Sequence, residues 1–481
     1  MGEKTLTEYS KGKNEIPRVL LAGTHSGAGK TTITCALLRA LQKRGRKLSA
    51  FKCGPDYIDP MFHREVLGVD SGNLDSFFQN EIQLRDSLLR HTAEVDLAVI
   101  EGVMGYYDGI GFTNEASTAE VAASTDTPVI LVVDCKGRSQ SALAELYGFV
   151  HYRPEGERIK GVLLNRLTER LYEAAAERIR AMGLIPVGYL PEQKDFVLQS
   201  RHLGLVTPKE IKGFQEQVDR LADTLAKTVD LDSIERIAEK AIAAEDGYEV
   251  IEGAIPFPVI ESVAENPDGV RIAFAKDAAF CFYYRENIEM LQRLGARIVP
   301  FSPMTDAQLP DCDALILPGG YPELYAEALE KNESMRYDIC RRIEAGLPTI
   351  AECGGFLYLH DTLTDQDEKT YAGAGVIHAN CAYKGFQRQF GYITLRAEKD
   401  QLLANAGEEL KGHEFHYFVS DLECDAFCAE KPDHSRSWKA AVAGDTFYAG
   451  FPHISFAACP EAAERFVRAA SEYRRREKTV S

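Results

Sequence analysis

The stretch Gly23-Thr24-His25-Ser26-Gly27-Ala28-Gly29-Lys30-Thr31-Thr32 decides the fold of the first half of this chain. It follows the apolar run Arg18–Ala22 and opens a helical pattern over Lys30–Arg44. A strand, a glycine-rich turn and a helix in this order are the context of a phosphate-binding loop. The glycines let backbone N–H groups turn toward phosphate oxygens, and the start of the helix adds its positive end. The predicted nucleotide contacts are Gly27, Ala28, Gly29, Lys30, Thr31 and Thr32.

Short apolar runs rich in β-branched residues alternate with longer helical patterns after this loop. Buried parallel strands joined by crossover helices produce such a pattern, so we expect an α/β fold. The pattern restarts after a stretch with three prolines, which favours two α/β domains joined near residue 260. The runs are Arg18–Ala22, Leu97–Ile100, Val129–Val133 and Gly161–Leu164 in the first half, and Val270–Ala275, Ala314–Leu317 and Thr349–Ala351 in the second.

The predicted boundaries follow from this pattern. The charged, alanine-rich segment 206–246 is expected to form helical surface that leads to a linker. The last residues are expected to form a solvated, frayed tail. We divide the chain into an extension 1–16, a phosphate-loop domain 17–245, a linker 246–269, a second α/β domain 270–473 and a tail 474–481.

The composition is that of an ordinary globular protein, with 27% charged and 45% hydrophobic residues among 481. Because 55 Lys and Arg stand against 73 Asp and Glu, the net charge is −18, which argues against a dedicated nucleic-acid binder. Apolar runs are too short to cross a membrane, and the polar segment 1–16 lacks the core of a signal peptide. Eleven scattered cysteines without a Cys-x-x-Cys pair indicate a reducing cytoplasm.

Magnesium at a phosphate-binding loop needs oxygen ligands beyond Thr31, and carboxylates at strand ends are the candidates. Glu101 and Asp134 each end an apolar run, and Asp56 and Asp59 lie in a stiff segment between two prolines. Capping a helix or forming a turn is the alternative use of each Asp. We assign the metal to Thr31, Asp56 and Glu101.

A possible nucleophile lies in the second half, in Thr349-Ile350-Ala351-Glu352-Cys353-Gly354-Gly355-Phe356, which runs from a strand into a helix. A nucleophile on such a tight turn, relieved by glycines, is the elbow geometry of hydrolases. The helix start favours the thiolate of Cys353, and neighbouring backbone N–H groups can stabilise an oxyanion. The strand end Leu317-Pro318-Gly319-Gly320-Tyr321-Pro322 is suited to donate the second N–H. A small buried Cys in a glycine-rich turn is the alternative.

A thiolate mechanism also needs a base. His413 and His416, in the segment GHEFHY at 412–417, form one candidate group, and His453 is the other. His453 follows a strand-like run, as Cys353 does, so these two side chains could meet at one sheet edge. The residue chemistry alone leaves the choice of base open.

These motifs together resemble the cobyrinic acid a,c-diamide synthase family, the glutamine-dependent amidotransferases of corrinoid biosynthesis. The resemblance runs in matching order from about Arg18 to Ala458, and GPDYIDP followed by ECGG makes it specific. The matching segments are GTHSGAGKTT at 23–32, KCGPDYIDPMFH at 52–63, NLDSFF at 73–78, EGVMGYYDG at 101–109, SRHLGLV at 200–206, LPGGYPE at 317–323, AECGGFLYL at 351–359 and GHEFHY at 412–417.

The resemblance implies an N-terminal ATP-binding domain similar to dethiobiotin synthetase and a C-terminal glutaminase domain of the class I type. Cys353 then corresponds to the nucleophile that takes glutamine as a thioester, and His453 to its base. Most amidotransferases of the wider class carry a Glu two residues after this His, where the chain has Ser455. Cys353 and His453 therefore look like a dyad. The positions expected to bind the oxyanion or glutamine are Gly319, Gly320 and Gly354.

The implied chemistry uses ATP with Mg²⁺ to convert a peripheral carboxylate of the corrinoid into an acyl phosphate, which ammonia from glutamine then displaces. The c and a acetate side chains are amidated in turn, each with its own ATP and glutamine. The expected partners are cobyrinic acid, ATP and L-glutamine, without nucleic acid or membrane, for a monomer or homodimer. The residues expected near the substrate are Asp56, Tyr57, Asp59, Asp75 and Asp108, with Lys52, Arg201 and His202 as cations or as a solvated face.

Three alternatives stay open. The same diamidation could act on nickel-sirohydrochlorin or hydrogenobyrinic acid, because such enzymes share the motifs. A regulatory P-loop ATPase with a non-catalytic glutaminase domain is an alternative of another class, and a degenerate domain usually loses the nucleophile that Cys353 supplies here. The last alternative is a synthetase that uses free ammonia.

Overall fold

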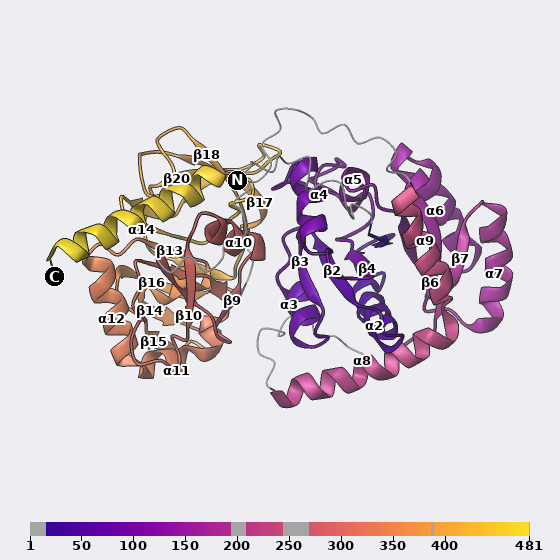
Figure 1. The fold of residues 1–481 in the computed structure, drawn as a ribbon, viewed down its shortest axis with the longest axis horizontal. Helices are drawn as coiled ribbons and strands as arrows, with labels where there is room; N and C mark the ends of the chain where they lie inside the picture. The colour runs from indigo at the N-terminus through magenta and orange to yellow at the C-terminus, as the bar shows by residue number, and fades with distance from the viewer. Residues whose placement is uncertain (1–15, 194–207, 244–268, 386–388, 481) are drawn as a thin grey trace, which may run out of the picture. The chain divides into compact units, whose positions relative to one another are not determined.

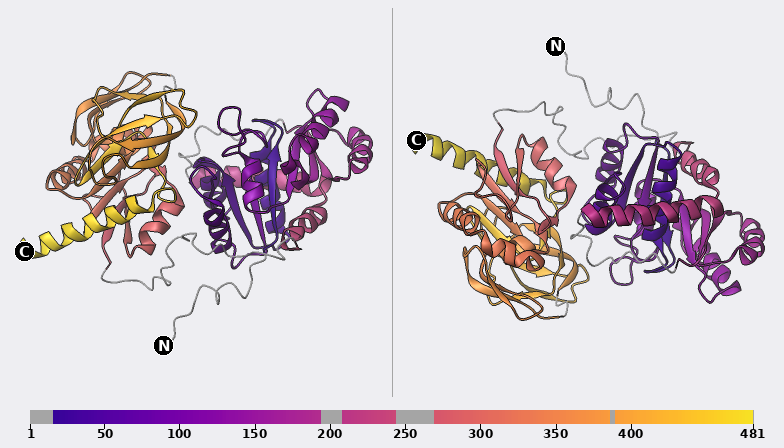
Figure 2. Two further views of the ribbon diagram at one scale, coloured as in Figure 1. Left: turned by 90° about the horizontal axis from the view of Figure 1, so that it is seen from above. Right: turned by 90° about the horizontal axis from the view of Figure 1, so that it is seen from below.

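The computed structural model describes residues 16–193, 208–243, 269–385 and 389–480. The chain divides into two compact units, Met1–Pro256 and Phe257–Ser481, each with its own sheets and covering helices (Figures 1 and 2). The predicted junction near residue 260 and nearly all of the linker 246–269 lie outside the described residues. Arg201 and His202, expected as cationic partners of the substrate, also lie outside them.

The first unit is built on a seven-stranded parallel sheet in the order β3-β2-β4-β1-β5-β6-β7. The apolar runs of the first half are its central strands, buried because helices cover both faces. β4 lies between β1 and β2, so residues at the ends of these three strands come together. The strands are β1 (Arg18–Gly23), β2 (Leu48–Cys53), β3 (Asp70–Leu74), β4 (Leu97–Glu101), β5 (Val129–Asp134), β6 (Ile159–Asn165) and β7 (Ile185–Leu190).

Two helical layers enclose this sheet, as Figure 1 shows. α2, α3, α8 and α9 share one apolar core with one face of the sheet, and α4 to α7 share another core with the opposite face. The helical surface predicted over 206–246 is confirmed in its described part as α8 and α9. The helices are α2 (Lys30–Lys43), α3 (Ile58–Glu65), α4 (Glu81–Arg90), α5 (Thr118–Ser124), α6 (Gln140–His151), α7 (Glu169–Ala181), α8 (Pro208–Thr228) and α9 (Leu231–Ala243).

The second unit is built on a six-stranded sheet in the order β10-β8-β11-β13-β23-β22, parallel except for the last pair. β13 lies between β11 and β23, so the loops that follow these three strands meet at one sheet edge. The strands are β8 (Arg271–Ala275), β10 (Arg297–Phe301), β11 (Ala314–Leu317), β13 (Thr349–Glu352), β22 (Val442–Gly444) and β23 (Phe447–Gly450).

A five-stranded antiparallel sheet, β21-β20-β17-β18-β24, shares a core with this central sheet and with α10 and α14. Its last pair carries His413 opposite His453. The elements are α10 (Arg285–Arg293), β17 (Phe390–Ala397), β18 (Glu409–Phe415), β20 (Phe427–Glu430), β21 (Ser437–Ala440), β24 (His453–Ile454) and α14 (Pro460–Val480). Smaller elements complete the unit: β9 (Phe280–Phe282), β12 (Gly319–Gly320), η3 (Pro322–Tyr325), α11 (Ala326–Lys331), α12 (Glu333–Glu344), α13 (Gly354–Tyr358), β14 (His360–Thr364), β15 (Thr370–Ala372), β16 (Ile377–Tyr383) and β19 (Phe418–Ser420).

The chain end differs from the expected frayed tail, because α14 continues as helix from Pro460 to Val480. Phe466, Ala470 and Tyr473 recur at helical spacing and are buried, so an apolar stripe holds the helix on the unit. The guanidinium of Arg474 also donates to the carbonyl of Gly269 at 3.0 Å. Across the described residues, no helix combines the length and the apolarity needed to span a bilayer.

Candidate active site

The phosphate-binding loop lies between β1 and α2. Gly27 and Gly29 have φ angles of 83° and 100°, which glycine adopts without steric cost. A Cβ on Gly29 would lie 2.2 Å from Nδ2 of Asn165. That amide donates a hydrogen bond of 2.8 Å to the carbonyl of Ala28. Asn165, at the end of β6, therefore braces the loop, and the third glycine leaves room for this contact.

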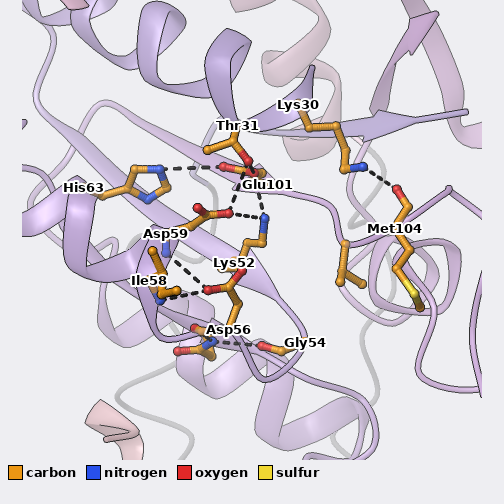
Figure 3. A network of polar contacts seen from close by, with 12 residues as sticks. Lys30, Thr31, Lys52, Gly54, Asp56, Ile58, Asp59, His63, Glu101 and Met104 are labelled. Carbon is orange, nitrogen blue, oxygen red and sulfur yellow. Dashed lines mark hydrogen bonds and ion pairs between the residues drawn. The ribbon is translucent and has the colours of Figure 1, made fainter. Parts of the chain in front are cut away.

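Lys30 begins α2 and is buried beside the loop. Its ammonium donates to the carbonyl of Met104 (Figure 3). It also donates to the carbonyl of His25 at 3.3 Å. Burial first, and then repulsion by Lys52, lower the pKa of Lys30 to about 8. A buried cation whose hydrogen bonds to described residues go to neutral carbonyls is well placed to gain from an anionic phosphate.

A buried cluster of charges lies beside the loop at the ends of β2 and β4 (Figure 3). Lys52 and Glu101 are register partners on these strands. Nζ of Lys52 lies 2.6 Å from Oε1 of Glu101 and 2.5 Å from Oδ2 of Asp59. The hydroxyl of Thr31 donates to Oε1 of Glu101 at 2.6 Å, and Oδ2 of Asp59 is 3.3 Å away. Nε2 of His63 lies 3.7 Å from Oε2 of Glu101.

One positive side chain, Lys52, faces two carboxylates in this cluster. Burial and the neighbouring Asp59 raise the pKa of Glu101 to about 7. Burial opposes the charge of Lys52 as well, but Asp59 and Glu101 together hold its pKa well above the usual range. Lys52 in turn lowers the pKa of Asp59 against the effect of burial. Lys52 is therefore the counter-ion of two carboxylates that lie side by side.

The oxygen atoms of this cluster fit magnesium. Thr31, Asp59 and Glu101 offer hard oxygen donors, and Oε2 of Glu101 is buried without a hydrogen-bond donor among the described residues. In the described parts of the chain, no three His, Cys, Asp or Glu side chains are arranged to hold a metal ion. Two carboxylates and a hydroxyl are thus an incomplete shell, as expected where Mg²⁺ also binds phosphate oxygens and water.

Asp56, which we assign to the metal from its motif, serves the start of α3. Its Oδ1 accepts hydrogen bonds from the backbone N–H groups of Ile58 and Asp59, at 2.8 and 3.3 Å. Burial, followed by repulsion from Asp59, raises the pKa of Asp56 to about 6. Asp59, assigned to the substrate, is the carboxylate that lies beside Thr31. The geometry therefore favours Asp59 over Asp56 as a metal ligand.

The remaining polar candidates of this unit form turn hydrogen bonds or ion pairs with other residues of the unit. Oδ1 of Asp75 accepts from the backbone N–H of Phe77, and Oδ2 of Asp108 accepts from that of Gly105, both at 2.9 Å. Asp134 accepts from Nε of Arg166 at 2.7 Å. Such turns and pairs are the common structural use of Asp. Tyr57 is the residue that precedes α3, at its N-cap position.

Cys353 lies on a sharp turn between β13 and α13. Its φ of 46° and ψ of −98° are strained for a residue with a side chain. Its backbone N–H donates to the carbonyl of Gly450 at 2.8 Å, which ties the turn to β23. A Cβ on Gly354 would lie 2.8 Å from the backbone nitrogen of Gly320. The predicted elbow is present, and the glycine loop after β11 packs directly against it.

His453 begins β24, and its ring is near both Gly319 and Glu352. A Cβ on Gly319 would lie 2.3 Å from Cε1 and 3.0 Å from Nε2 of His453. Nδ1 of His453 lies 3.7 Å from Oε2 of Glu352, the residue before Cys353. The structure thus brings His453 to the elbow and to the glycine loop.

The other two histidine candidates lie behind His453. His413 is its register partner on β18. His416 stacks on Phe451 with ring centroids 3.7 Å apart, and its Nδ1 bonds to the carbonyl of Phe418 at 2.7 Å. Since a carbonyl only accepts, Nδ1 of His416 carries the proton.

Burial decides the charge states at the elbow. It raises the pKa of the Cys353 thiol, with Glu323 and Glu414 adding to the effect. The resting group is therefore a thiol, and not the thiolate that we expect from the start of the helix. Burial and the neighbouring His416 lower the pKa of His453 to about 3, so its imidazole is neutral. A neutral imidazole is the form that general-base activation of a thiol requires.

Two residues make contacts in the structure that we do not expect from the sequence. Lys52 is expected to face the substrate, yet it pairs with Asp59 and Glu101. Glu352 has no assigned role, although it faces His453. The sequence does contain a signal for both residues, because each is a charged residue in an otherwise apolar strand. A charged side chain in such a strand is seldom buried without a partner.

Comparisons with known proteins cover both units. Residues 19–206 match the family described as CobQ/CobB/MinD/ParA nucleotide binding domain, and residues 271–458 match the CobB/CobQ-like glutamine amidotransferase domain.

Relatives similar to the whole chain carry the name cobyrinate a,c-diamide synthase. The one from Listeria innocua serovar 6a is 36% identical over 449 residues, covering 91% of this chain and 96% of that protein. The one from Salmonella typhimurium strain LT2 is 38% identical over 460 residues, covering 94% and 97%. The one from Thermoplasma volcanium is 36% identical over 469 residues, covering 95% and 98%. A solved structure of the signal recognition particle receptor FtsY from Elizabethkingia anophelis is 14% identical, covers 44% of this chain and 67% of that one, and has a TM-score of 0.29.

Proposed function

The chain belongs to the cobyrinate a,c-diamide synthase family, and on that premise we propose how its two sites divide the reaction. The enzyme is an ATP-dependent ligase that amidates the a and c acetate side chains of cobyrinic acid with nitrogen from glutamine. The first unit activates the carboxylate, and the second unit releases ammonia from glutamine.

In the second unit, the thiol of Cys353 attacks the side-chain amide carbon of glutamine. His453 takes the thiol proton and returns it to the leaving nitrogen, so ammonia departs and a thioester remains. Water then hydrolyses the thioester to glutamate. The backbone N–H groups of Gly320 and Gly354 are proposed to stabilise the oxyanion. The observation that carries this proposal is the strained backbone of Cys353, with φ of 46°. The next residue, Gly354, packs against the glycine loop whose Gly319 contacts the ring of His453.

In the first unit, the loop backbone from Gly27 to Thr32 and the ammonium of Lys30 are proposed to bind the phosphates of ATP. Thr31, Asp59 and Glu101 would hold Mg²⁺, which neutralises phosphate charge when bound. Lys30 stabilises the negative charge that develops on the transferring phosphoryl group, because it is buried and its hydrogen bonds to described residues go to neutral carbonyls. The acceptor is a carboxylate of the corrinoid, and ammonia displaces the phosphate from the resulting acyl phosphate.

Mass spectrometry of the product from cobyrinic acid, ATP and glutamine tests this function. The expected product carries two new amides. In the Cys353→Ala variant, we expect amidation with glutamine to be lost and amidation with ammonium to persist. Loss of both activities would make Cys353 a structural residue, and unchanged activity with glutamine would contradict the thioester route.

The same assay separates the substrate alternatives. Amidation of nickel-sirohydrochlorin or hydrogenobyrinic acid, with cobyrinic acid left unchanged, would overturn the assignment of substrate. ATP hydrolysis without amidation of any of these tetrapyrroles would favour a regulatory ATPase.

A further inference from the structure

We infer that Glu352 is the residue that positions His453, taking the part that a Glu two residues after the His plays in other amidotransferases of the wider class. This inference rests on the proposed glutaminase function of Cys353 and His453. Glu352 would act from the residue before the nucleophile, and not from the segment that follows the base.

The carboxylate of Glu352 is fixed by the strand that carries the base. Glu352 ends β13 and is buried. Its Oε1 accepts a hydrogen bond of 2.9 Å from the backbone N–H of Ile454, next to His453. Its Oε2 lies 3.7 Å from Nδ1 of His453. One oxygen is therefore anchored, and the other faces the ring at a distance that a small side-chain rotation closes.

The Cε1–Nε2 edge of the ring faces the glycine loop. Gly319 lies against Cε1 and Nε2 of His453, whereas Glu352 faces Nδ1. A proton on Nδ1 that points to Glu352 leaves the lone pair of Nε2 on the side of the loop. This is the tautomer that a base needs in order to accept the thiol proton.

Among the described residues around the ring of His453, Glu352 is the carboxylate that lies within 4 Å of a ring nitrogen. His413 faces His453 from β18, and His416 follows that strand. Burial lowers the pKa of both, to about 3 and about 4, so both are neutral. Lys431 acts on His413, and Glu414 lies 4.0 Å from His416. Ser455 carries no charge that could stabilise an imidazolium.

Glu352 and His453 bind protons as a pair. When the pair holds two protons, Nε2 carries one of them and cannot act as a base. When one proton leaves, the carboxylate accepts from Nδ1 and Nε2 is free. Burial raises the pKa of Glu352 to about 8, so this carboxyl keeps its proton to a higher pH than a carboxyl in water would.

Glu352→Gln tests this inference, because the amide keeps the shape and the oxygen that accepts from Ile454. Its NH₂ group would donate to Nδ1 of His453 and place the proton on Nε2. We expect kcat for glutamine hydrolysis to fall by about 100-fold or more. The acidic limb of kcat/KM for glutamine should move to lower pH, while amidation with ammonium persists. Glu352→Asp should restore part of the activity and of the pH profile.

Asp313→Asn is the matched control, because it also removes a buried carboxylate from the central sheet. Asp313 precedes β11 at the edge opposite the elbow, where it pairs with Arg271. This variant should lose stability without moving the pH limb. A Glu352→Gln enzyme with a wild-type pH limb would overturn the inference, whether or not its activity falls. Glutaminase activity in Cys353→Ala would instead contradict the proposed function.

Discussion

At the residue scale, one ammonium compensates two buried carboxylates. Lys52 lies within 2.6 Å of Glu101 and 2.5 Å of Asp59, and all three side chains are nearly inaccessible. In Lys52→Met, these two carboxylates would face each other without a cation. We expect the free energy of unfolding of the first unit to fall by about 3–5 kcal/mol, measured by urea denaturation.

Lys43→Met is the matched control for this loss. Lys43 pairs with Asp223 at 2.6 Å, but their side chains are 36% and 61% exposed. An exposed pair contributes about 0–1 kcal/mol. Equal losses in the two variants would show that burial does not set the strength of the Lys52 pair.

The pKa of Lys30 predicts how ATP binding depends on pH. Because burial and Lys52 lower this pKa to about 8, the ammonium is present below that pH and is lost above it. Calorimetric titration with ATP should show the affinity falling as the pH rises through about 8. The Lys30→Arg variant keeps its charge, so any affinity it retains should lack this alkaline fall. A wild-type affinity that stays constant up to pH 10 would contradict the assignment of Lys30 to the phosphates.

Motif spacing locates the acidic segment at 52–60 but does not choose between its two carboxylates. Asp56 and Asp59 are three residues apart, and the start of α3 determines their directions. Asp56 turns back to the helix N–H groups, and Asp59 turns toward Thr31. The sequence marks the segment as special, whereas the side-chain directions depend on the first turn of the helix.

At the scale of elements, the elbow works only if two loops pack without side chains between them. In Gly354→Ala, the new methyl group would meet the backbone nitrogen of Gly320 at 2.8 Å and Cδ of Pro322 at 3.0 Å. We expect the loop to be displaced and kcat for glutamine to fall by about 100-fold, as when an oxyanion donor is lost.

Gly444→Ala is the control, because a Cβ there would meet no atom within 4 Å. Its glutaminase activity should match wild type, and its free energy of unfolding should change by less than about 0.5 kcal/mol. If Gly354→Ala kept full activity, the loop after β11 could not supply the oxyanion contact.

Strands and loops could be read from the sequence because buried parallel strands are apolar and phosphate loops need glycines. The end of the chain could not be read in this way. The charges from Arg474 to Lys478 suggest solvation, yet the apolar stripe of Phe466, Ala470 and Tyr473 holds α14 in place. A charged exposed face does not distinguish a frayed tail from the outer side of a packed helix.

At the scale of the whole molecule, each unit has its own apolar cores. A ligand that binds one folded unit stabilises that unit by mass action, by about 2.7 kcal/mol at 100 times its Kd. We therefore expect ATP with Mg²⁺ to raise the unfolding temperature of the first unit alone. Limited proteolysis during heating, with fragments identified by mass, would assign the shift to a unit. Equal protection of both units by ATP would contradict independent stabilisation.

Contacts between distant parts of the chain are the features that the sequence could not provide. Glu352 and His453 approach each other because β13 pairs with β23, and because the chain after β23 turns back to pair with β18. No spacing in the sequence encodes that register. The sequence supplies the nucleophile that we propose and two competing groups of candidate bases, and the sheet order brings one of these candidates, His453, to the elbow.

The pairing of Lys52 with Asp59 and Glu101 also bears on how the protein is made. A site formed from bare carboxylates would repel itself until a cation arrived, so maturation would depend on the supply of metal. Here the polypeptide brings its own cation, so we expect the first unit to fold without added metal.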